Sequence, residues 1–209
     1  MTTTDAAEYW DRLYAARPMP VDPGPNVRLT ETVRGLEPGE ALDLGCGPGG
    51  DALWLARRGW QVTAVDVSTV TVERLTSLAS EHGLSSRITA CPHDLHRSLP
   101  DGTFDLINAH YLHTPLDLDR ATVLRAAAHA LRQSGRLIVV DHGSTAPWSW
   151  NQDPDVRYPT PLEVAAGLDL DPRSWRIETA RAATRSATGP NGLTADVTDH
   201  ILVVRRTAP

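Results

Sequence analysis

Lysine is absent from this chain of 209 residues, so all 20 of its basic residues are arginine. The absence excludes a Schiff-base lysine, a P-loop lysine that holds phosphates, and the lysine of a Tyr-x-x-x-Lys dehydrogenase site. We attribute it to the codon bias of a GC-rich genome, and the exclusions hold whatever the cause.

Cysteine and long apolar runs are also scarce. The two cysteines, Cys46 and Cys91, do not make a disulfide framework. No apolar run approaches the ~20 residues of a membrane span, and the polar stretch Met1–Asp5 lacks the core of a signal peptide. These features predict a cytoplasmic protein with no membrane partner.

Positive charge is in deficit, because the formal net charge is −6. Binding of nucleic acid without regard to sequence needs a basic surface, so we expect no nucleic-acid partner. Independently of charge, we expect a monomer or homodimer. A composition of 41% hydrophobic and 22% charged residues is typical of a globular protein. We therefore expect a single domain over residues 1–209, in which a helical segment over 1–39 covers the site and a core spans 40–209.

Strand and helix patterns alternate from residue 41 onward. The expected strands lie at 41–44, 61–65, 87–91, 104–109 and 136–140, followed by a final pair near 175–182 and 198–205. The expected helices lie at 5–16, about 26–36, 51–58, 68–82, about 119–133 and about 161–168. This α/β alternation predicts a doubly wound, Rossmann-like sheet of about seven strands with an antiparallel last strand and N-terminal helices.

A glycine-rich turn, Asp43-Leu44-Gly45-Cys46-Gly47-Pro48-Gly49-Gly50, follows the first strand of the core. Such a turn lets backbone amides approach a ligand closely. The spacing Gly45-x-Gly47-x-x-Gly50 also satisfies the dinucleotide fingerprint, so the glycines alone do not identify the ligand. Asp43 favours a cationic amino group, because a carboxylate repels a pyrophosphate. S-adenosylmethionine (SAM) carries an amino group and a sulfonium, and it has no phosphate.

Motifs in order along the chain carry a family resemblance. They are Asp43-x-Gly45-x-Gly47-x-Gly49, Asp66 after the second strand, Asp94-Leu95 after the third, and Phe104-Asp105-Leu106-Ile107 as the fourth. Over about residues 26–206 the chain resembles the class I SAM-dependent methyltransferases, most closely the small bacterial tellurite-resistance and thiopurine methyltransferase-like branch. The segment Leu131–Gly135 departs from the Pro-Gly-Gly turn that is usual in the family. The resemblance implies methyl transfer, with SAM as cofactor and S-adenosylhomocysteine as product.

In such a fold the cofactor lies over the carboxyl ends of the strands. The resemblance implies that Asp43 orients the amino group and that Asp94 accepts from the adenine amine. Asp66 lies 17 residues past Gly49, near the ~20 expected of a ribose-binding acid. The full set expected to contact the cofactor is Asp43, Gly45, Cys46, Gly47, Gly49, Asp66, Val67, Asp94, Leu95, Asn108 and Trp10.

Histidines after the fourth and fifth strands are candidates for a general base. His110 or His113 is the first choice and His142 the second, although a base is needed only when the acceptor must lose a proton. Alternatively, these histidines pack against or cap the strand ends. His110-x-x-His113 is also the one suggestive metal-ligand pair, but a pair alone does not make a metal site, and we expect none.

Aromatic and arginine side chains are the candidates for holding the methyl acceptor. The expected acceptor-binding residues are Tyr14, Tyr111, Trp148, Trp150 and Arg28, with Arg185 as a further cation for an anionic acceptor. We expect a small-molecule acceptor with an oxygen, nitrogen or sulfur nucleophile. Two alternatives stay open: a SAM-binding sensor or scaffold without catalysis, and an NAD(P)-dependent reductase.

Overall fold

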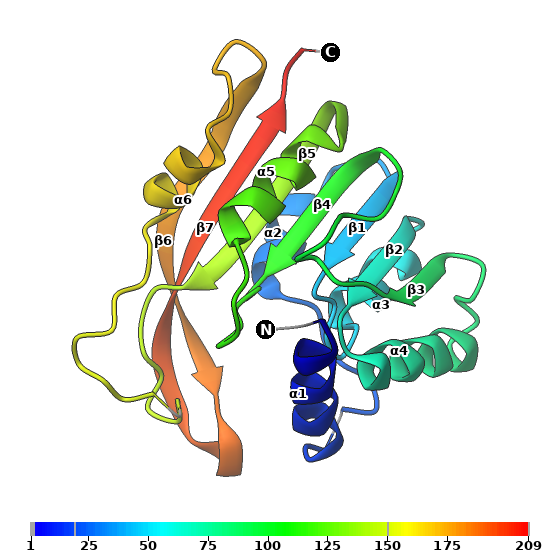
Figure 1. The fold of residues 1–209 in the computed structure, drawn as a ribbon, viewed down its shortest axis with the longest axis vertical. Coiled ribbons are helices and arrows are strands. Elements are labelled where there is room, and N and C mark those ends of the chain that lie inside the picture. Colours follow the sequence, from blue (N-terminus) through cyan, green and yellow to red (C-terminus); the bar gives the residue numbers. More distant parts are fainter. Residues whose placement is uncertain (1–2, 19, 150, 209) are drawn as a thin grey trace.

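The computed structural model describes residues 3–18, 20–149 and 151–208. It contains one seven-stranded sheet with the strand order β3-β2-β1-β4-β5-β7-β6 (Figure 1). The strands are β1 (Glu40–Leu44), β2 (Gln61–Asp66), β3 (Ile88–Pro92), β4 (Phe104–His110), β5 (Leu131–His142), β6 (Trp175–Thr188) and β7 (Thr194–Arg206). The helices are α1 (Thr3–Ala15), α2 (Val27–Val33), α3 (Gly50–Arg57), α4 (Thr69–Glu81), α5 (Arg120–His129) and α6 (Pro161–Leu168), with a short 3₁₀ turn at Pro190–Gly192.

The first five strands are parallel, and β7 runs antiparallel to both β5 and β6. The predicted fold class, a Rossmann-like sheet with a reversed last strand, is therefore confirmed. Order reverses between β1 and β4, where the chain returns to the centre of the sheet. Ligands of open α/β sheets bind at such a switch point, beyond the carboxyl ends of the strands.

The core lies on both faces of the sheet because the central strands are apolar throughout. On one face, Leu29 of α2, Leu53 of α3 and Leu75 of α4 are buried against the sheet. On the other face, Leu124 of α5 and Leu168 of α6 are buried. Burying one such side chain stabilises the fold by about 1.5–3 kcal/mol, so the two layers together hold the strand ends in place.

One predicted boundary is wrong, because the helix expected to run to residue 133 ends at His129. From Leu131 the chain is already in β5, where Leu131 pairs with Phe104. Gly135 permits this path: a side chain there would meet the carbonyl oxygen of Phe104 at 3.0 Å. The segment that departs from the family's turn is thus an early, bulged start of β5.

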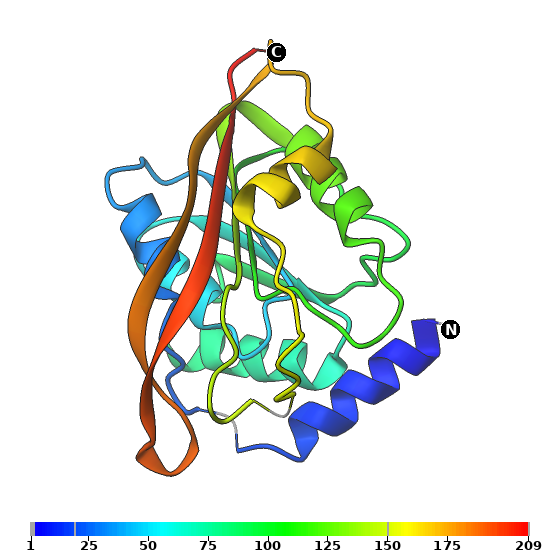
Figure 2. The same ribbon diagram turned by 90° about the vertical axis from the view of Figure 1, so that its left-hand side faces the viewer.

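The terminal hairpin is longer than predicted. Pairing of β5 with β7 ends at His142 and Asp199, whereas β6 and β7 stay paired as far as Thr188 and Thr194. Figures 1 and 2 show this outer half of the hairpin extending past the end of β5 as a twisted ribbon. Its residues alternate between exposed and half-buried, so they carry little of the hydrophobic signal of a buried strand.

The first helix, α1, lies below the arrowheads of β1 and β4 in Figure 1, across the carboxyl ends of the strands. None of the helices within the described ranges is both long and apolar enough to cross a membrane.

Candidate active site

The glycine turn after β1 needs glycine for two reasons. Gly45 and Gly47 have φ angles of +67° and +48°, which side chains disfavour. A Cβ on Gly45 would also meet Cδ1 of Leu112 at 2.7 Å, and one on Gly47 would meet the Tyr14 hydroxyl at 3.2 Å. The turn is therefore closely covered by the loop after β4 and by α1.

Two cavities border this turn, and they share Tyr14, Gly45 and Tyr111 as lining residues. The larger has a volume of about 610 Å³, and the smaller has about 120 Å³. Side chains of the larger one include Asp43, Cys46, Asp51, His110 and Arg185. Side chains of the smaller one include Trp10, Asp66, Val67, Asp94 and Leu95. An extended ligand could pass along the turn from one cavity to the other.

Asp43 presents a buried carboxylate to the larger cavity. Its residue is 3% exposed, and its Oδ1 accepts a hydrogen bond from Nδ2 of Asn108 at 2.6 Å. No group in the described part of the chain partners its Oδ2. Burial and the nearby charge of Asp51 raise the pKa of Asp43 well above its usual range. A buried, unpartnered carboxylate oxygen is costly, and a bound cation would relieve that cost.

Asp66 stands at the end of β2 and connects two backbone segments. Its Oδ2 accepts from the backbone N–H of Gly47 at 3.0 Å, and its Oδ1 accepts from Ser68 at 2.9 Å. Burial raises the pKa of Asp66, and these backbone bonds partly oppose the shift. Each oxygen retains a second acceptor position, so the carboxylate can still bind hydroxyl groups of a ligand.

The smaller cavity places Asp94 and Leu95 opposite α1. Oδ1 of Asp94 accepts from the backbone N–H of His96 at 3.0 Å. On the α1 side, the rings of Trp10 and Tyr14 lie 5.8 Å apart. An apolar, aromatic pocket with one carboxylate suits a planar group that carries a hydrogen-bond donor.

Asp11 holds α1 in place over this cavity, a role the sequence did not reveal. Its Oδ1 accepts from the Ser68 hydroxyl at 2.6 Å and from the Val70 backbone at 3.2 Å, and its Oδ2 accepts from the Thr69 hydroxyl at 2.8 Å. Burial alone raises the pKa of Asp11, but these hydrogen bonds lower it. Asp11 thus caps the start of α4 from a separate helix.

His110 lies at the end of β4 and belongs to the larger cavity. Its Nδ1 lies 2.6 Å from Oδ2 of Asp51, and Oδ1 of Asp51 accepts from the backbone N–H of Asn26 at 2.6 Å. No local pattern marks Asp51 as a site residue, because an acidic residue in the first turn of a helix is common without any further role.

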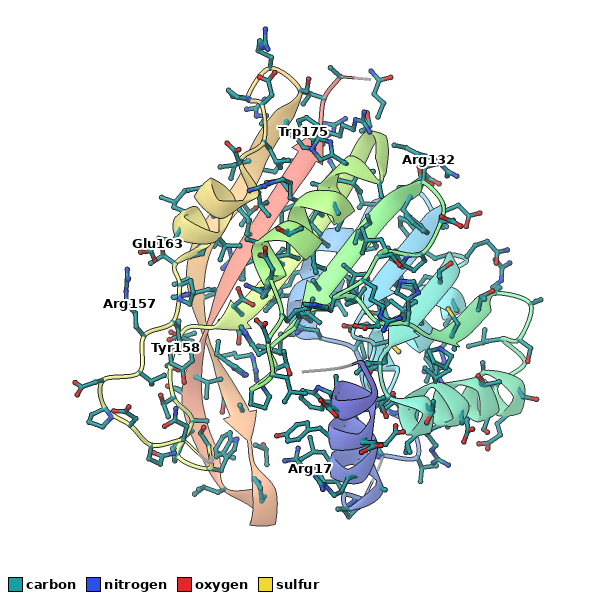
Figure 3. The ribbon with its side chains drawn as sticks, viewed as in Figure 1. Arg17, Arg132, Arg157, Tyr158, Glu163 and Trp175 are labelled. Atoms are coloured by element: carbon teal, nitrogen blue, oxygen red, sulfur yellow. The ribbon has the colours of Figure 1, made fainter. Side chains whose placement is uncertain are left out.

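The other two candidate histidines have different surroundings. His113 lines the smaller cavity, with its Nε2 3.3 Å from Oδ1 of Asp141. His142 is exposed and stacks on Tyr111 at 4.4 Å between ring centroids, with Tyr158 edge-on at 6.3 Å. Partial burial and the neighbouring His113 lower the pKa of His142. Figure 3 labels Tyr158 in the loop that precedes α6. Of the three histidines, only His110 is among the described residues that line the larger cavity.

Tyr111 is held between the cavities by a buried ion-pair cluster. Its hydroxyl donates to Oδ1 of Asp199 at 2.8 Å, and Oδ2 of Asp199 accepts from Nε of Arg28 at 3.0 Å and Nε of Arg185 at 2.9 Å. Asp199 is 1% exposed. The buried carboxylate of Asp199 therefore fixes the positions of Tyr111 and of two arginines. No local sequence pattern around Asp199 indicated this role.

Arg28 does not reach the acceptor side, so its expected role needs correction. Its remaining nitrogens donate to Glu31 and to the carbonyl oxygens of Ala183 and Thr184. Arg28 is not among the described residues that line either cavity at the turn. It braces α2 against β6 and β7, because the cluster around Asp199 occupies its guanidinium.

Trp148 is likewise not among the described residues that line either cavity. It packs on Gly189 at the tip of the hairpin, where a Cβ would overlap its ring. The loop tryptophan therefore anchors its own loop to the hairpin. Trp150, the other predicted acceptor contact, lies outside the described residues.

Asn108 and Gly49 support the site without being among the described residues that line either cavity. Asn108 is fully buried and reaches the cavity only through its bond to Asp43. Gly49 begins α3 with a φ of +85°, and Leu75 packs where its side chain would be. Cys46 does line the larger cavity, and burial raises the pKa of its thiol well above the usual range. Across the described ranges, no group of three or more His, Cys, Asp or Glu side chains is arranged to hold a metal.

Comparison with known proteins adds direct sequence evidence. Residues 41–135 match the family model described as a methyltransferase domain. The chain is 37% identical over 106 residues to Methyltransferase GfsG of Streptomyces halstedii, covering 49% of this chain and 37% of that protein. It is 30% identical over 139 residues to the ubiquinone biosynthesis O-methyltransferase of Aeromonas salmonicida, covering 64% of this chain and 56% of that protein.

Two solved structures share the fold. One, reported as "Conversion of a Disulfide Bond into a Thioacetal Group during Echinomycin Biosynthesis", has a TM-score of 0.72 at 24% identity and covers 96% of this chain and 93% of its own. The other is TehB from Haemophilus influenzae, with a TM-score of 0.67 at 16% identity over 97% of this chain and 67% of its own.

The fold is a Rossmann-like seven-stranded sheet, and residues 41–135, which include the glycine turn, match a methyltransferase-domain family model. The matched region of this chain covers only 37% and 56% of the lengths of these two curated relatives.

Proposed function

We propose that the protein is a SAM-dependent methyltransferase that acts on an oxygen, nitrogen or sulfur atom of a small molecule. The buried, unpartnered oxygen of Asp43 carries this proposal, because Asp43 lines the larger cavity beside the glycine turn. An ammonium group satisfies a buried carboxylate, whereas a pyrophosphate in the same place would be repelled. The residues present therefore fit SAM better than the nicotinamide cofactor of a reductase.

The chain's own residues would hold SAM from end to end. Asp43 would receive the amino group, Asp66 the ribose hydroxyls, and Asp94 the adenine amine, with Trp10 covering the ring. When bound, SAM supplies a methyl group on an already activated sulfonium. The protein's tasks are then alignment and exclusion of water, which α1 assists by closing over the smaller cavity.

The acceptor side is the larger cavity, where Arg185 is the cation that can meet an anionic acceptor group. A small-molecule acceptor is supported by the Aeromonas relative, whose name specifies O-methylation in ubiquinone biosynthesis. The net charge of −6 supports the absence of a nucleic-acid partner. The cytoplasmic location, the single-domain organisation and the monomeric or dimeric state remain predictions.

We place the protein in the tellurite-resistance and thiopurine methyltransferase-like branch. Support comes from the N-terminal helix α1, which carries Trp10 and Tyr14 to the site, and from the shared fold of TehB.

Calorimetric titration tests the cofactor directly. We expect micromolar binding of S-adenosylhomocysteine and no binding of NADH. Asp43→Asn should weaken the former, while Asp101→Asn, on an exposed turn, serves as the matched control. Failure of the wild-type protein to bind S-adenosylhomocysteine would overturn the proposal. Binding without methyl transfer to any acceptor in a broad panel would favour the non-catalytic sensor or scaffold.

A further inference from the structure

His110 is buried with one ring nitrogen satisfied and the other not. Its side chain is 5% exposed, and Nδ1 lies 2.6 Å from Oδ2 of Asp51. Within the described chain, Nε2 has no hydrogen-bond partner. Leaving a buried nitrogen unpaired is costly, and His110 lines the larger cavity, so a ligand that reaches Nε2 from that cavity would supply the missing partner.

The contact with Asp51 determines which nitrogen carries the proton. A carboxylate only accepts hydrogen bonds, so the neutral imidazole must donate from Nδ1–H to Asp51. The lone pair is then on Nε2. His110, a lining residue of the larger cavity, therefore carries a buried proton acceptor in a fixed orientation, which is the arrangement of an oriented general base.

The second oxygen of Asp51 ties this histidine to the cavity wall. Oδ1 accepts from the backbone N–H of Asn26 at 2.6 Å, and the side chain of Asn26 caps the start of α2. The wall residues Pro23, Gly24, Pro25 and Asn26 all line the larger cavity. Asp51 thus sets the orientation of His110 and the position of the facing segment together.

We propose that His110 is the general base of the reaction, that Asp51 is its positioning residue, and that the acceptor is a hydroxyl compound, a phenol or an alcohol. In the transfer, the O–H bond breaks and its proton goes to Nε2 of His110. The oxygen forms the new bond to the methyl carbon, and the electron pair of the broken carbon–sulfur bond stays on sulfur. This inference rests on the proposed methyltransferase function.

The acceptor class follows from the presence of a buried base. A tertiary amine has no proton to lose, and a thiol already supplies a few per cent of highly nucleophilic thiolate near neutral pH, so neither depends strongly on a base. A hydroxyl group needs one, because its pKa of about 10 or above leaves it neutral in the cell. The alternative base, His113, lines the smaller cavity, and its side chain is 39% exposed, against 5% for His110.

A first experiment reads the tautomer without relying on catalysis. In ¹⁵N-histidine NMR spectra of the complex with S-adenosylhomocysteine, wild-type His110 should be the Nδ1–H tautomer. Asp51→Asn supplies one oxygen for two donors, so it should shift His110 toward the Nε2–H tautomer or release the Asn26 amide to solvent exchange. An Nε2–H tautomer in the wild-type protein would overturn the inference.

A second experiment separates the acceptor classes by coupled detection of S-adenosylhomocysteine. With a simple phenol, His110→Gln and Asp51→Asn should lower kcat by about 100-fold or more, and raising the pH should restore part of the rate. Rates with a thiol or a tertiary amine should not fall, and the surface variant His129→Gln should behave as wild type. An unchanged phenol rate in His110→Gln would refute the base. If wild type binds no S-adenosylhomocysteine, the proposed function fails, and the tautomer of the free protein still decides the Asp51–His110 pairing.

Discussion

Asp66 accepts a hydrogen bond from the backbone N–H of Gly47 at 3.0 Å, so the acid that ends β2 holds the glycine turn that follows β1. The same carboxylate binds the backbone of Ser68, whose hydroxyl donates to Asp11 of α1. Three separate segments of the site are therefore joined through one buried acid.

Substitution of Asp66 should affect cofactor affinity and stability together. Asp66→Ala removes the acceptor for the ribose hydroxyls, and we expect a loss of about 1.5–3 kcal/mol of binding free energy for S-adenosylhomocysteine. It also leaves the Gly47 and Ser68 amides unpaired, so the melting temperature should fall. Titration calorimetry and thermal unfolding measure the two effects. An unchanged affinity would remove Asp66 from the ribose site.

Asp43 should lower the stability of the free protein and strengthen the binding of the cofactor. The pKa of Asp43 is raised in the folded state, so ionising this carboxyl destabilises the fold. This destabilisation is absent below a pH of about 3.8 and grows as the pH rises above that value. Asp43→Asn should therefore raise the free energy of unfolding at pH 7 and weaken cofactor binding. Denaturant titrations at pH 4 and pH 7 test the sign: a variant less stable than wild type at pH 7 contradicts it.

The same raised pKa predicts proton release when the cofactor binds. A cationic amino group favours the ionised form of Asp43, which burial and Asp51 disfavour in the free protein. The affinity for S-adenosylhomocysteine should rise as the pH increases above about 3.8, as long as its amino group stays protonated. Calorimetry in two buffers of different ionisation enthalpy counts the protons. Asp43→Asn should release fewer, and equal release in the two proteins would refute the pairing.

Loss of Asp11 should free α1 without unfolding the sheet. Asp11→Ala removes hydrogen bonds to Ser68, Thr69 and Val70, each worth about 0.5–1.5 kcal/mol. We expect faster dissociation of S-adenosylhomocysteine and earlier proteolytic cleavage within α1. Glu8→Ala, an exposed change on the same helix, is the control. Identical cleavage rates in the two variants would show that Asp11 does not secure α1.

Arg28 should matter for folding more than for acceptor binding. Arg28→Met takes one cation from the buried Asp199, and breaking a buried pair costs about 3–5 kcal/mol. Denaturant unfolding measures the loss. Arg185→Met should cost less, because its side chain is 31% exposed. It should instead raise the KM for an anionic acceptor, and a larger KM effect from Arg28→Met would reverse this assignment.

Local patterns were sufficient for the sheet, which the alternation of apolar strands and amphipathic helices predicted. The acid before Gly45 predicts a cationic ligand group, and this stays a prediction. The predicted end of α5 was wrong because contacts with a neighbouring strand determine it. Leu131 pairs with Phe104 of β4, so the helix ends earlier than its sequence suggests. Propensity alone could not show this, because the residues before Gly135 are compatible with a helix.

Residues close together in the chain are enough to predict the fold class, the glycine turn and the nearby acids Asp43, Asp66 and Asp94. Three-dimensional contacts were needed to show which histidine lines the larger cavity, that Asp51 orients it, and that Arg28 and Trp148 serve the framework. These outcomes depend on contacts between distant segments, such as Arg28 with Asp199 and Trp148 with Gly189. The chemistry of a side chain limits the groups that it can bind, and the fold determines which of those groups lie within its reach.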